Sequence, residues 1–398
     1  MKFVTPSGSY KLKRIPQTQK GDLRAWDAAD ELLLHTFLES HDNKDMTRSN
    51  SKPILIINDS FGALSLALHN SEIHNWSDSY LSHLAVNHNK KLNGLSSSIR
   101  CIASSEKLEE SYQHVLIKIP KTLALLEDQL YRLKQHIKED TVLIAAAMSK
   151  HIHTSTLKLF EKIIGRTTTS RAVKKARLIF ANNDHIQKQQ SPYPKIITEP
   201  SLNLHLSNHA NVFAKDHLDI GTRFFIQQLK QCPSATNIID LGCGNGALGI
   251  IMQRYQPQAK LHFIDESYMA IASAKENYLK ENPDSPENSP ENSPENGSKN
   301  TSKNNATFTI SNCLSQFSNT NTIDLILCNP PFHQSHSIGD QIAWQMFKQS
   351  HQRLHKNGEL WIIGNRHLNY HAKLKRLFGN CKTIASNKKF VVLAAIKK

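Results

Sequence analysis

A strand, a glycine-rich turn and a helix follow one another over residues 237–255, and this succession constrains the fold more than any other feature of the chain. The apolar run 237–241 predicts a short strand, and the apolar stretch 247–255 predicts a helix. Glycines between them let the backbone turn sharply and approach a ligand closely. The succession therefore predicts the ligand-binding turn of an α/β fold. The candidate contacts are Asp240, Gly242, Gly244, Asn245 and Gly246.

Strands and helices continue to alternate after this turn. Further strands are predicted over 261–264, 306–310, 324–328, 359–363 and 390–396. Helices are predicted over 269–279, 340–355 and 373–378. Strands that alternate with helices predict a mainly parallel, doubly wound sheet.

The length of 398 residues predicts two domains. A polar stretch over 182–194 is the predicted linker, which gives domains at 1–190 and 191–398. Within the second domain, Ser-Pro-Glu-Asn occurs three times in succession from Ser285. Such a segment has no apolar residues to bury, so a disordered insertion without catalytic role is predicted over 282–304.

Acidic and amide side chains follow two of the later strands. Asp265 and Glu266 stand about 20 residues beyond the glycine turn, where a carboxylate can accept hydrogen bonds from both ribose hydroxyls of a nucleoside. NAD and S-adenosylmethionine would be served equally by this acid. Asn312, after the strand 306–310, is the candidate for the adenine edge, and an ordinary turn asparagine is the alternative. Upstream, Phe213 and Asp219 are candidates for the methionine end of S-adenosylmethionine, and ordinary residues of a helix entry are the alternative.

The most specific motif is Asn329-Pro330-Pro331-Phe332, which follows the strand 324–328. An exocyclic amine on an aromatic ring is a poor nucleophile because its lone pair is shared with the ring. The side-chain oxygen of Asn329 and the carbonyl of Pro330 can accept both amine hydrogens and stabilise the charge that develops during attack on a methyl group. Phe332 offers a flat face on which an extruded base can stack. These three residues are the predicted catalytic residues, and neither a metal nor a covalent intermediate is required.

Charge, cysteine spacing and apolar content predict the kind of partner, the state of the thiols and the location of the protein. The formal net charge of +15 favours a polyanionic partner such as nucleic acid. The six cysteines are widely spaced, which predicts reduced thiols and no metal site. No stretch approaches the roughly 20 apolar residues of a spanning helix, and no secretory signal precedes the first domain, so a cytoplasmic protein is expected.

The two halves also resemble each other. Residues 61–66 echo 245–250, and 78–81 echo 266–269 in the same order, which predicts duplication of one α/β unit. In the first copy Asn58-Asp59-Ser60-Phe61 replaces the glycine turn, and Lys118-Ile119-Pro120-Lys121 replaces the Asn-Pro-Pro-Phe motif. This copy is therefore predicted neither to hold cofactor nor to catalyse, and a role in RNA recognition or structural support is expected of it.

The motifs Asp240–Gly246 and Asn329–His333, with Asn208–Phe213 and Pro120–Glu127, resemble the ribosomal RNA guanine-N2 methyltransferases nearly end to end. The members that act on the large subunit are the most similar. The resemblance implies two tandem Rossmann-like methyltransferase domains with a seven-stranded sheet, S-adenosyl-L-methionine as cofactor, and guanine N2 of 23S rRNA as target. We expect naked or early-assembly RNA as substrate, and a monomer.

The motifs leave alternatives open. Enzymes that methylate adenine N6 or a protein glutamine use the same tetrapeptide, and the small-subunit (16S) rRNA enzymes share the C-terminal motifs. A non-catalytic RNA-binding protein of ribosome assembly is a further alternative. The intact Asp240, Gly242, Gly244 and Asn329 argue against the last of these.

Overall fold

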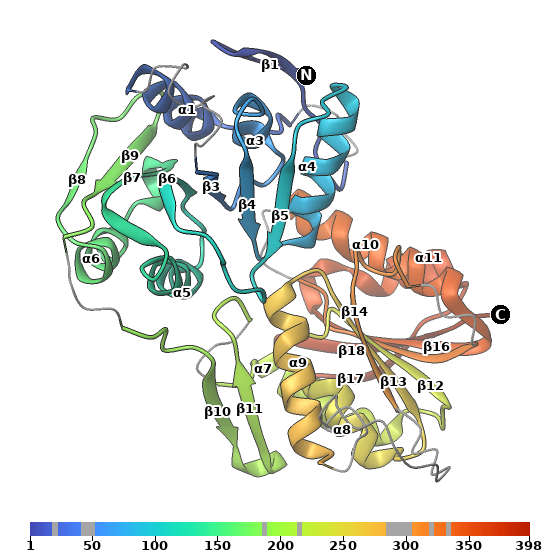
Figure 1. The fold of residues 1–398 in the computed structure, drawn as a ribbon. Helices are drawn as coiled ribbons and strands as arrows, with labels where there is room; N and C mark the ends of the chain where they lie inside the picture. The colour runs from blue at the N-terminus through green and yellow to red at the C-terminus, as the bar shows by residue number, and fades with distance from the viewer. Residues whose placement is uncertain are drawn as a thin grey trace, which may run out of the picture. The chain divides into compact units, whose positions relative to one another are not determined.

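The structure is a computed structural model that describes residues 1–17, 23–40, 52–184, 189–212, 217–283, 305–317, 322–331 and 336–398, with the backbone alone over 336–339. The chain forms two compact units, Met1–Tyr193 and Pro194–Lys398 (Figure 1). Most of the predicted insertion, residues 284–304, lies outside the described residues. None of the helices in the described part of the chain is long and apolar enough to cross a membrane.

The C-terminal unit is built on a seven-stranded sheet with the order β14-β13-β12-β15-β16-β18-β17. Neighbours from β14 to β16 are parallel, and β18 is antiparallel to both β16 and β17. This confirms the predicted fold class, a mainly parallel seven-stranded sheet. The strands are β12 (Asn237–Leu241), β13 (Lys260–Asp265), β14 (Ala306–Ile310), β15 (Ile323–Cys328), β16 (Leu354–Asn365), β17 (Lys382–Ser386) and β18 (Phe390–Ile396).

Helices cover both faces of this sheet (Figure 1). The core on one face joins α7, α8 and α9 to the sheet, and the core on the other joins α10 and α11 to it. Alternate residues of β12 enter opposite cores, Ile238 the first and Ile239 the second, as a strand buried on both faces requires. The helices are α7 (Ile220–Ile226), α8 (Ala247–Tyr255), α9 (Tyr268–Glu281), α10 (His336–Arg353) and α11 (Tyr370–Phe378), and the hairpin β10 (Lys195–Glu199) with β11 (Leu204–Asn208) precedes them.

The N-terminal unit repeats this plan. Its sheet has the order β5-β4-β3-β6-β7-β9-β8, which is the order of the other sheet strand for strand. The strands are β3 (Ile54–Ile57), β4 (Ile73–Ser77), β5 (Ile99–Ala103), β6 (Tyr112–Lys118), β7 (Ile137–Met148), β8 (Thr167–Thr169) and β9 (Ala176–Ala181). Helices α1 (Ala28–Ser40), α3 (Ala63–Ala67) and α4 (Tyr80–Leu92) pack on one face and α5 (Leu123–Leu133) and α6 (Thr154–Ile163) on the other. The hairpin β1 (Lys2–Thr5) with β2 (Gly8–Lys11) begins the unit.

Matching hydrogen bonds support the predicted duplication. Asn277 on α9 donates to the carbonyl of Asn245 in the glycine turn over 3.0 Å. Asn89 on α4 donates to the carbonyl of Phe61, in the corresponding turn, over 2.9 Å. Asn277 also exchanges two hydrogen bonds with the backbone of Ser207 in β11, and Asn89 exchanges two with the backbone of Lys13, just after β2. The two units thus fasten hairpin, turn and helix together in the same way.

Some predicted element bounds were wrong. The helix predicted over 340–355 ends at Arg353, because Leu354 already pairs with Ile323 in the sheet. The strand predicted over 359–363 accordingly spans Leu354–Asn365, with Gly358 inside it.

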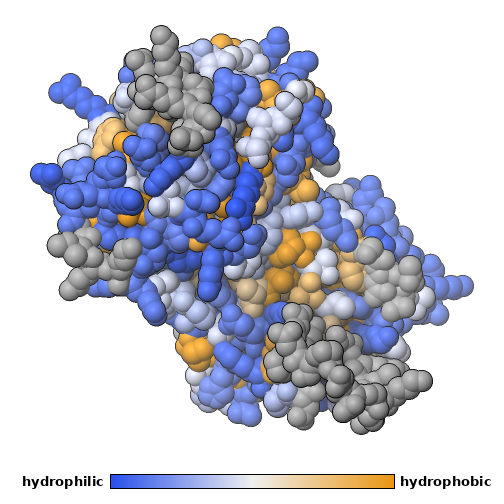
Figure 2. Space-filling model, in the orientation of Figure 1, coloured by the Kyte–Doolittle hydropathy of each residue, from blue (hydrophilic) through white to orange (hydrophobic). Residues whose placement is uncertain are grey.

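On the outside, the N-terminal unit is mainly hydrophilic over the face drawn in Figure 2.

Candidate functional site

The register of the C-terminal sheet brings the predicted site residues to one edge. Leu241 at the end of β12 pairs with Ile264 of β13 and with Cys328 of β15, and Asp265 pairs with Ile310 of β14. Four parallel strands therefore end side by side. The strand ends and the segments that follow them hold the glycine turn, Asp265, Glu266, Asn312 and Asn329. Residues up to 87 positions apart, from Gly242 to Asn329, therefore share the carboxyl edge of the sheet, where open α/β folds bind ligands.

The glycine turn has the conformation that its sequence predicts. The φ angles of Gly242, Gly244 and Gly246 are 71°, 56° and 82°, in the left-handed region that favours glycine. A Cβ on Gly246 would lie 3.2 Å from the Cα of Ala274, so this glycine allows close packing against α9. A Cβ on Gly244 would have no described atom within 4 Å. The turn thus packs on the protein at Gly246, whereas at Gly244 no described residue would meet a side chain.

Asp265, the last residue of β13, binds the glycine turn at this edge of the sheet. Its Oδ2 accepts from the backbone amide of Gly244 over 3.0 Å, and its Oδ1 accepts from the amide of Ser267 over 3.0 Å. Asp265 and the adjacent Glu266 are both half-buried. A carboxylate already bound to the turn would repel a pyrophosphate at the same place, whereas it would attract a cationic ligand. The geometry therefore favours a nucleoside cofactor without phosphate over a dinucleotide.

Asp240 lies beneath the turn and is only 1 % exposed. Its Oδ2 accepts from the backbone amide of Gly249 on α8 over 2.9 Å, and among the described residues its Oδ1 has no hydrogen-bond partner. Burial raises the pKa of Asp240 to about 8, and the nearby charge of Asp265 adds to the effect while the bond from Gly249 opposes it. In this position Asp240 supports the start of α8, and direct contact with a cofactor stays a prediction.

The two asparagines predicted to touch cofactor are engaged within the protein. Asn245 donates to Oδ1 of Asn208 over 3.0 Å and accepts from the amide of Ala247 over 3.3 Å. Asn312 accepts from Nε2 of Gln345 on α10 over 3.1 Å. Asn312 stands beyond β14 on the same sheet edge as Asp265, as predicted, and its role at the adenine edge stays a prediction.

Asn329 directly follows β15 at the same edge. Its Nδ2 donates to Oγ1 of Thr222 on α7 over 2.9 Å. Its Oδ1 is buried and has no partner among the residues that the structure describes. Pro330 beside it is buried as well. A buried acceptor without a partner is costly, and such a group at a ligand-binding edge indicates a hydrogen-bond donor on the ligand.

The neighbouring thiol is no nucleophile. Burial raises the pKa of Cys328 well above its usual value, so the sulfur next to Asn329 is protonated at neutral pH. Direct transfer between two bound molecules needs no such nucleophile.

Of the remaining predicted site residues, Asp219 is described by the structure and the two phenylalanines are not. Asp219 caps α7, since its Oδ2 accepts from the amide of Thr222 over 2.9 Å. Phe213 and Phe332 lie outside the described residues. Thr222 was missed by the sequence analysis, although the spacing Asp-x-x-Thr is typical of a capped first helical turn and could have drawn attention to it. In the described part of the chain, no three His, Cys, Asp or Glu side chains are grouped as metal ligands.

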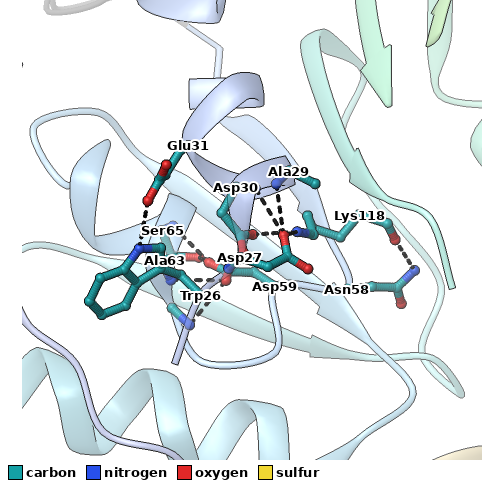
Figure 3. A network of polar contacts seen from close by, with 11 residues as sticks. Trp26, Asp27, Ala29, Asp30, Glu31, Asn58, Asp59, Ala63, Ser65 and Lys118 are labelled. Atoms are coloured by element: carbon teal, nitrogen blue, oxygen red, sulfur yellow. Dashed lines mark hydrogen bonds and ion pairs between the residues drawn. The ribbon is translucent and has the colours of Figure 1, made fainter. Parts of the chain in front are cut away.

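The N-terminal unit carries an ion cluster where the C-terminal unit carries Asn329. Ile57 pairs with Ile117 as Leu241 pairs with Cys328, which puts Lys118 at the position of Asn329. Lys118 Nζ lies 2.8 Å from Asp27 Oδ1 and 2.8 Å from Asp30 Oδ1 (Figure 3).

The electrostatics of this cluster are those of a buried ion pair. Burial lowers the pKa of Lys118, but the charges of Asp30 and Asp27 outweigh burial and raise it. Burial raises the pKa of Asp30 to about 6, against the opposing charge of Lys118. The ammonium thus uses its donors on two carboxylates of its own unit, and it offers no acceptor for an amine.

A carboxylate also occupies the N-terminal turn. Asp59 accepts from the amides of Gly62 and Ala63, both over 3.0 Å, and from the amide and hydroxyl of Ser65, both over 2.8 Å (Figure 3). It is 1 % exposed. These three amides are therefore bound by the protein itself, and the absence of cofactor binding in this copy stays a prediction.

Comparison with known proteins gives matches over both units. Residues 1–185 match the family model described as RLMG N-terminal domain, and residues 203–394 match the model described as methyltransferase small domain. The chain is 44 % identical over 392 residues to a protein of Yersinia pestis (strain Pestoides F) named ribosomal RNA large subunit methyltransferase G, covering 98 % of this chain and 93 % of the relative. A protein of the same name from Colwellia psychrerythraea (strain 34H) is 43 % identical over 411 residues and is covered to 99 %, with 100 % of this chain.

Among solved structures, a T. thermophilus 16S rRNA N2 methyltransferase in complex with AdoMet and guanosine superimposes with a TM-score of 0.73. The alignment covers 100 % of this chain and 98 % of the neighbour at 17 % identity. At this identity the likeness is one of fold alone.

Proposed function

Because the chain belongs to the family of the ribosomal RNA large subunit methyltransferases G, we propose that it transfers a methyl group from S-adenosyl-L-methionine to the exocyclic N2 amine of a guanine in 23S rRNA. The C-terminal unit carries out the reaction. The observation that supports this most is the buried Oδ1 of Asn329, which has no partner in the described part of the chain and lies at the sheet edge that also holds the glycine turn.

The acceptor pair is proposed to work on the amine. Asn329 Oδ1 and the carbonyl of Pro330 accept the two N–H hydrogens, which orients the nitrogen lone pair toward the methyl group. As the nitrogen attacks and the bond between the methyl group and sulfur breaks, positive charge develops on the amine, and these two oxygens stabilise it until one N–H proton is released to solvent. Phe332 stacks on the extruded base in this proposal. The buried, protonated thiol of Cys328 takes no part.

The residues at the glycine turn fit the cofactor. The space beside Gly244, which no described atom fills, admits a ligand close to the backbone, and the half-buried Asp265 and Glu266 offer acceptors to ribose hydroxyls. Asp240, Gly242, Asn245 and Gly246 shape the turn, and Asn312, Phe213 and Asp219 are assigned to the adenine and methionine ends. S-adenosyl-L-methionine, when bound, supplies the electrophilic methyl group.

The N-terminal unit is proposed to recognise RNA or to support the catalytic unit. In this unit Asp59 binds amides of the turn, and Lys118, the counterpart of Asn329, is paired with Asp30, so a second methyl transfer site is not proposed there. The net charge of +15 favours contact with phosphates, and binding to RNA should weaken steeply as salt rises.

We propose a monomer in the cytoplasm that acts on naked or early-assembly 23S rRNA. Methylation of protein-free 23S rRNA and of finished large subunits by the purified protein, measured side by side, tests the last point.

Mapping modified nucleotides in cells tests the reaction. Ribosomal RNA from cells that lack the gene is digested and analysed by mass spectrometry, with both 16S and 23S rRNA examined. We expect one N2-methylguanosine to be missing from 23S rRNA and to return with the wild-type gene. Loss of a nucleotide from 16S rRNA, or loss of N6-methyladenosine, would assign the enzyme to another target.

A further inference from the structure

We propose that Thr222 is a positioning residue, whose hydroxyl sets the side-chain amide of Asn329 so that Oδ1 faces the substrate amine. This inference rests on the proposed function, because it concerns the acceptor that this function assigns to Asn329. Thr222 itself touches no reacting atom in the proposal. It acts through the orientation of the amide.

The contact that carries the inference joins residues 107 positions apart. Asn329 Nδ2 donates to Thr222 Oγ1 over 2.9 Å. Thr222 is the third residue of α7, and Asn329 is the first residue after β15. The amide of asparagine has a donor end and an acceptor end that differ little in size, so hydrogen bonding decides which end faces which side.

The Thr222 hydroxyl donates its hydrogen to Asp219 and accepts a hydrogen bond from Asn329. Asp219 Oδ2 accepts from the amide of Thr222 over 2.9 Å and from its hydroxyl over 3.4 Å. A carboxylate accepts only, so the hydroxyl hydrogen belongs to Asp219 and the lone pairs of Oγ1 remain for Asn329. These lone pairs can bind the NH₂ end of the amide and not its oxygen. Oδ1 is thereby turned to the other side, where it is buried without a partner among the described residues.

The helix that carries Thr222 is held firmly in the unit. Phe225 and Ile226 of α7 are buried in the core, and Arg223 forms an ion pair with the buried Glu199 at the end of β10. A Cβ on Gly221 would lie 2.9 Å from Asp219 Oδ2, so a glycine is needed beside the capping carboxylate. Such packing fixes the hydroxyl of Thr222 in place, as a group that positions another must be.

In the N-terminal unit, the positions that correspond to Thr222 and Asn329 hold charged side chains. Asp27 Oδ1 accepts from the amide of Asp30 at the start of α1, as Asp219 accepts from that of Thr222. Asp30 then binds Lys118, which stands at the position of Asn329. The contact between first helix and strand end is thus a feature of the fold, and the hydroxyl–amide pair is confined to the unit that carries the Asn-Pro-Pro motif.

Three variants of the full-length protein test the inference. Thr222→Val keeps the branched shape and removes the hydroxyl, Thr222→Ser keeps the hydroxyl, and Thr383→Val on the exposed strand β17 is the matched control. We expect Thr222→Val to lower kcat on 23S rRNA by about 10- to 100-fold, as for loss of one oriented contact in the transition state. Its Kd for S-adenosylmethionine should stay within about twofold of wild type, because Asp219 loses only the 3.4 Å bond from the hydroxyl and keeps the 2.9 Å bond from the amide of Thr222. Thr222→Ser should recover most of kcat, and Thr383→Val should equal wild type.

Two results would overturn the inference. One is a Thr222→Val variant with the kcat of wild type. The other is a Thr222→Ser variant as slow as Thr222→Val, which would assign the effect to the methyl group. Neutron crystal structures of the two Thr222 variants locate the hydrogens of the Asn329 amide directly, whatever the RNA substrate is. The inference predicts a displaced or turned Asn329 amide in Thr222→Val alone, and an unchanged amide would contradict it. Failure of the wild-type protein to methylate any guanine in rRNA would instead contradict the proposed function, and the crystal structures would still decide the role of Thr222.

Discussion

The backbone amide of Gly244 donates to Oδ2 of Asp265 over 3.0 Å, so the acid at the end of β13 touches the glycine turn directly. An amide of the turn that could bind a phosphate is therefore bound to a negative charge. The same carboxylate is half-buried and retains acceptor capacity toward ribose hydroxyls. This one contact separates the site from that of a dinucleotide enzyme more clearly than the glycines do.

Removal of this carboxylate should weaken cofactor binding. In Asp265→Ala the turn loses its anchor and the ribose loses its acceptors, so we expect the Kd for S-adenosylmethionine to rise at least about tenfold, which is about 1.4 kcal/mol. Isothermal titration calorimetry measures it. Glu266→Ala serves as the matched control with a smaller effect. If the affinity of Asp265→Ala is unaltered and that of Glu266→Ala falls, the ribose contact belongs to Glu266.

A methyl group on Gly244 should obstruct the cofactor. In Gly244→Ala the Cβ occupies space that no described atom fills, at a residue whose φ of 56° also disfavours a side chain. Gly379→Ala is the matched control, because Gly379 has a φ of 76°, no described atom within 4 Å of its Cβ position, and a place at the end of α11. Both variants should lose about 1 kcal/mol of stability from the left-handed backbone. We expect only Gly244→Ala to lose affinity for S-adenosylmethionine, and equal affinities in a binding titration would contradict an open cofactor site at Gly244.

Asp240 gives the stability of the protein a pH dependence. Its pKa is raised to about 8 by burial, whereas in the unfolded chain it has the ordinary value for aspartate. Between about pH 4 and pH 8 the unfolded chain releases this proton and the folded chain keeps it, so this group lowers the free energy of unfolding as pH rises through that window. Asp240→Asn has no such proton. Its melting temperature relative to wild type should therefore increase from pH 5 to pH 8, and melting curves that stay parallel over this range would count against a neutral Asp240.

The ion cluster of the N-terminal unit should contribute to stability and not to cofactor binding. Lys118→Met leaves Asp30, with 9 % of its side chain exposed, without its cation. Loss of one partner of a buried ion pair costs about 3–5 kcal/mol, which denaturant unfolding should detect. Lys121→Met, at the exposed lysine three residues on, is the matched control and should be near neutral. A loss of affinity for S-adenosylmethionine in Lys118→Met would show that the N-terminal unit takes part in binding the cofactor.

Much of the fold was predictable where local signals are strong. The strand over 237–241 and the helix over 247–255 were confirmed residue for residue, because a short apolar run, a glycine turn and an apolar helix each have a local signature. Strand β17 and the hairpin β10–β11 were not predicted. Exposed residues interrupt their apolar pattern, since edge strands and isolated hairpins bury only part of their surface.

The site was predictable only as a set of residue types. The motif implied acceptors at Asn329 and Pro330, but the bond from Asn329 to Thr222 depends on how α7 packs across the end of β15, over 107 residues of sequence. The same holds for Lys118, Asp27 and Asp30, which are 91 positions apart at the widest. Sequence motifs name the groups, and tertiary packing decides which atoms remain unpaired.

The most direct test uses purified wild-type protein and Asn329→Ala with S-adenosylmethionine labelled in its methyl group, on 23S rRNA from cells that lack the gene. Binding of the cofactor and incorporation of label are measured together. The account predicts label on N2 of one guanine with wild-type protein, and for Asn329→Ala a Kd for the cofactor within about twofold of wild type with turnover reduced at least about 100-fold. Turnover by Asn329→Ala at the wild-type rate, or label on any atom other than guanine N2, would contradict it.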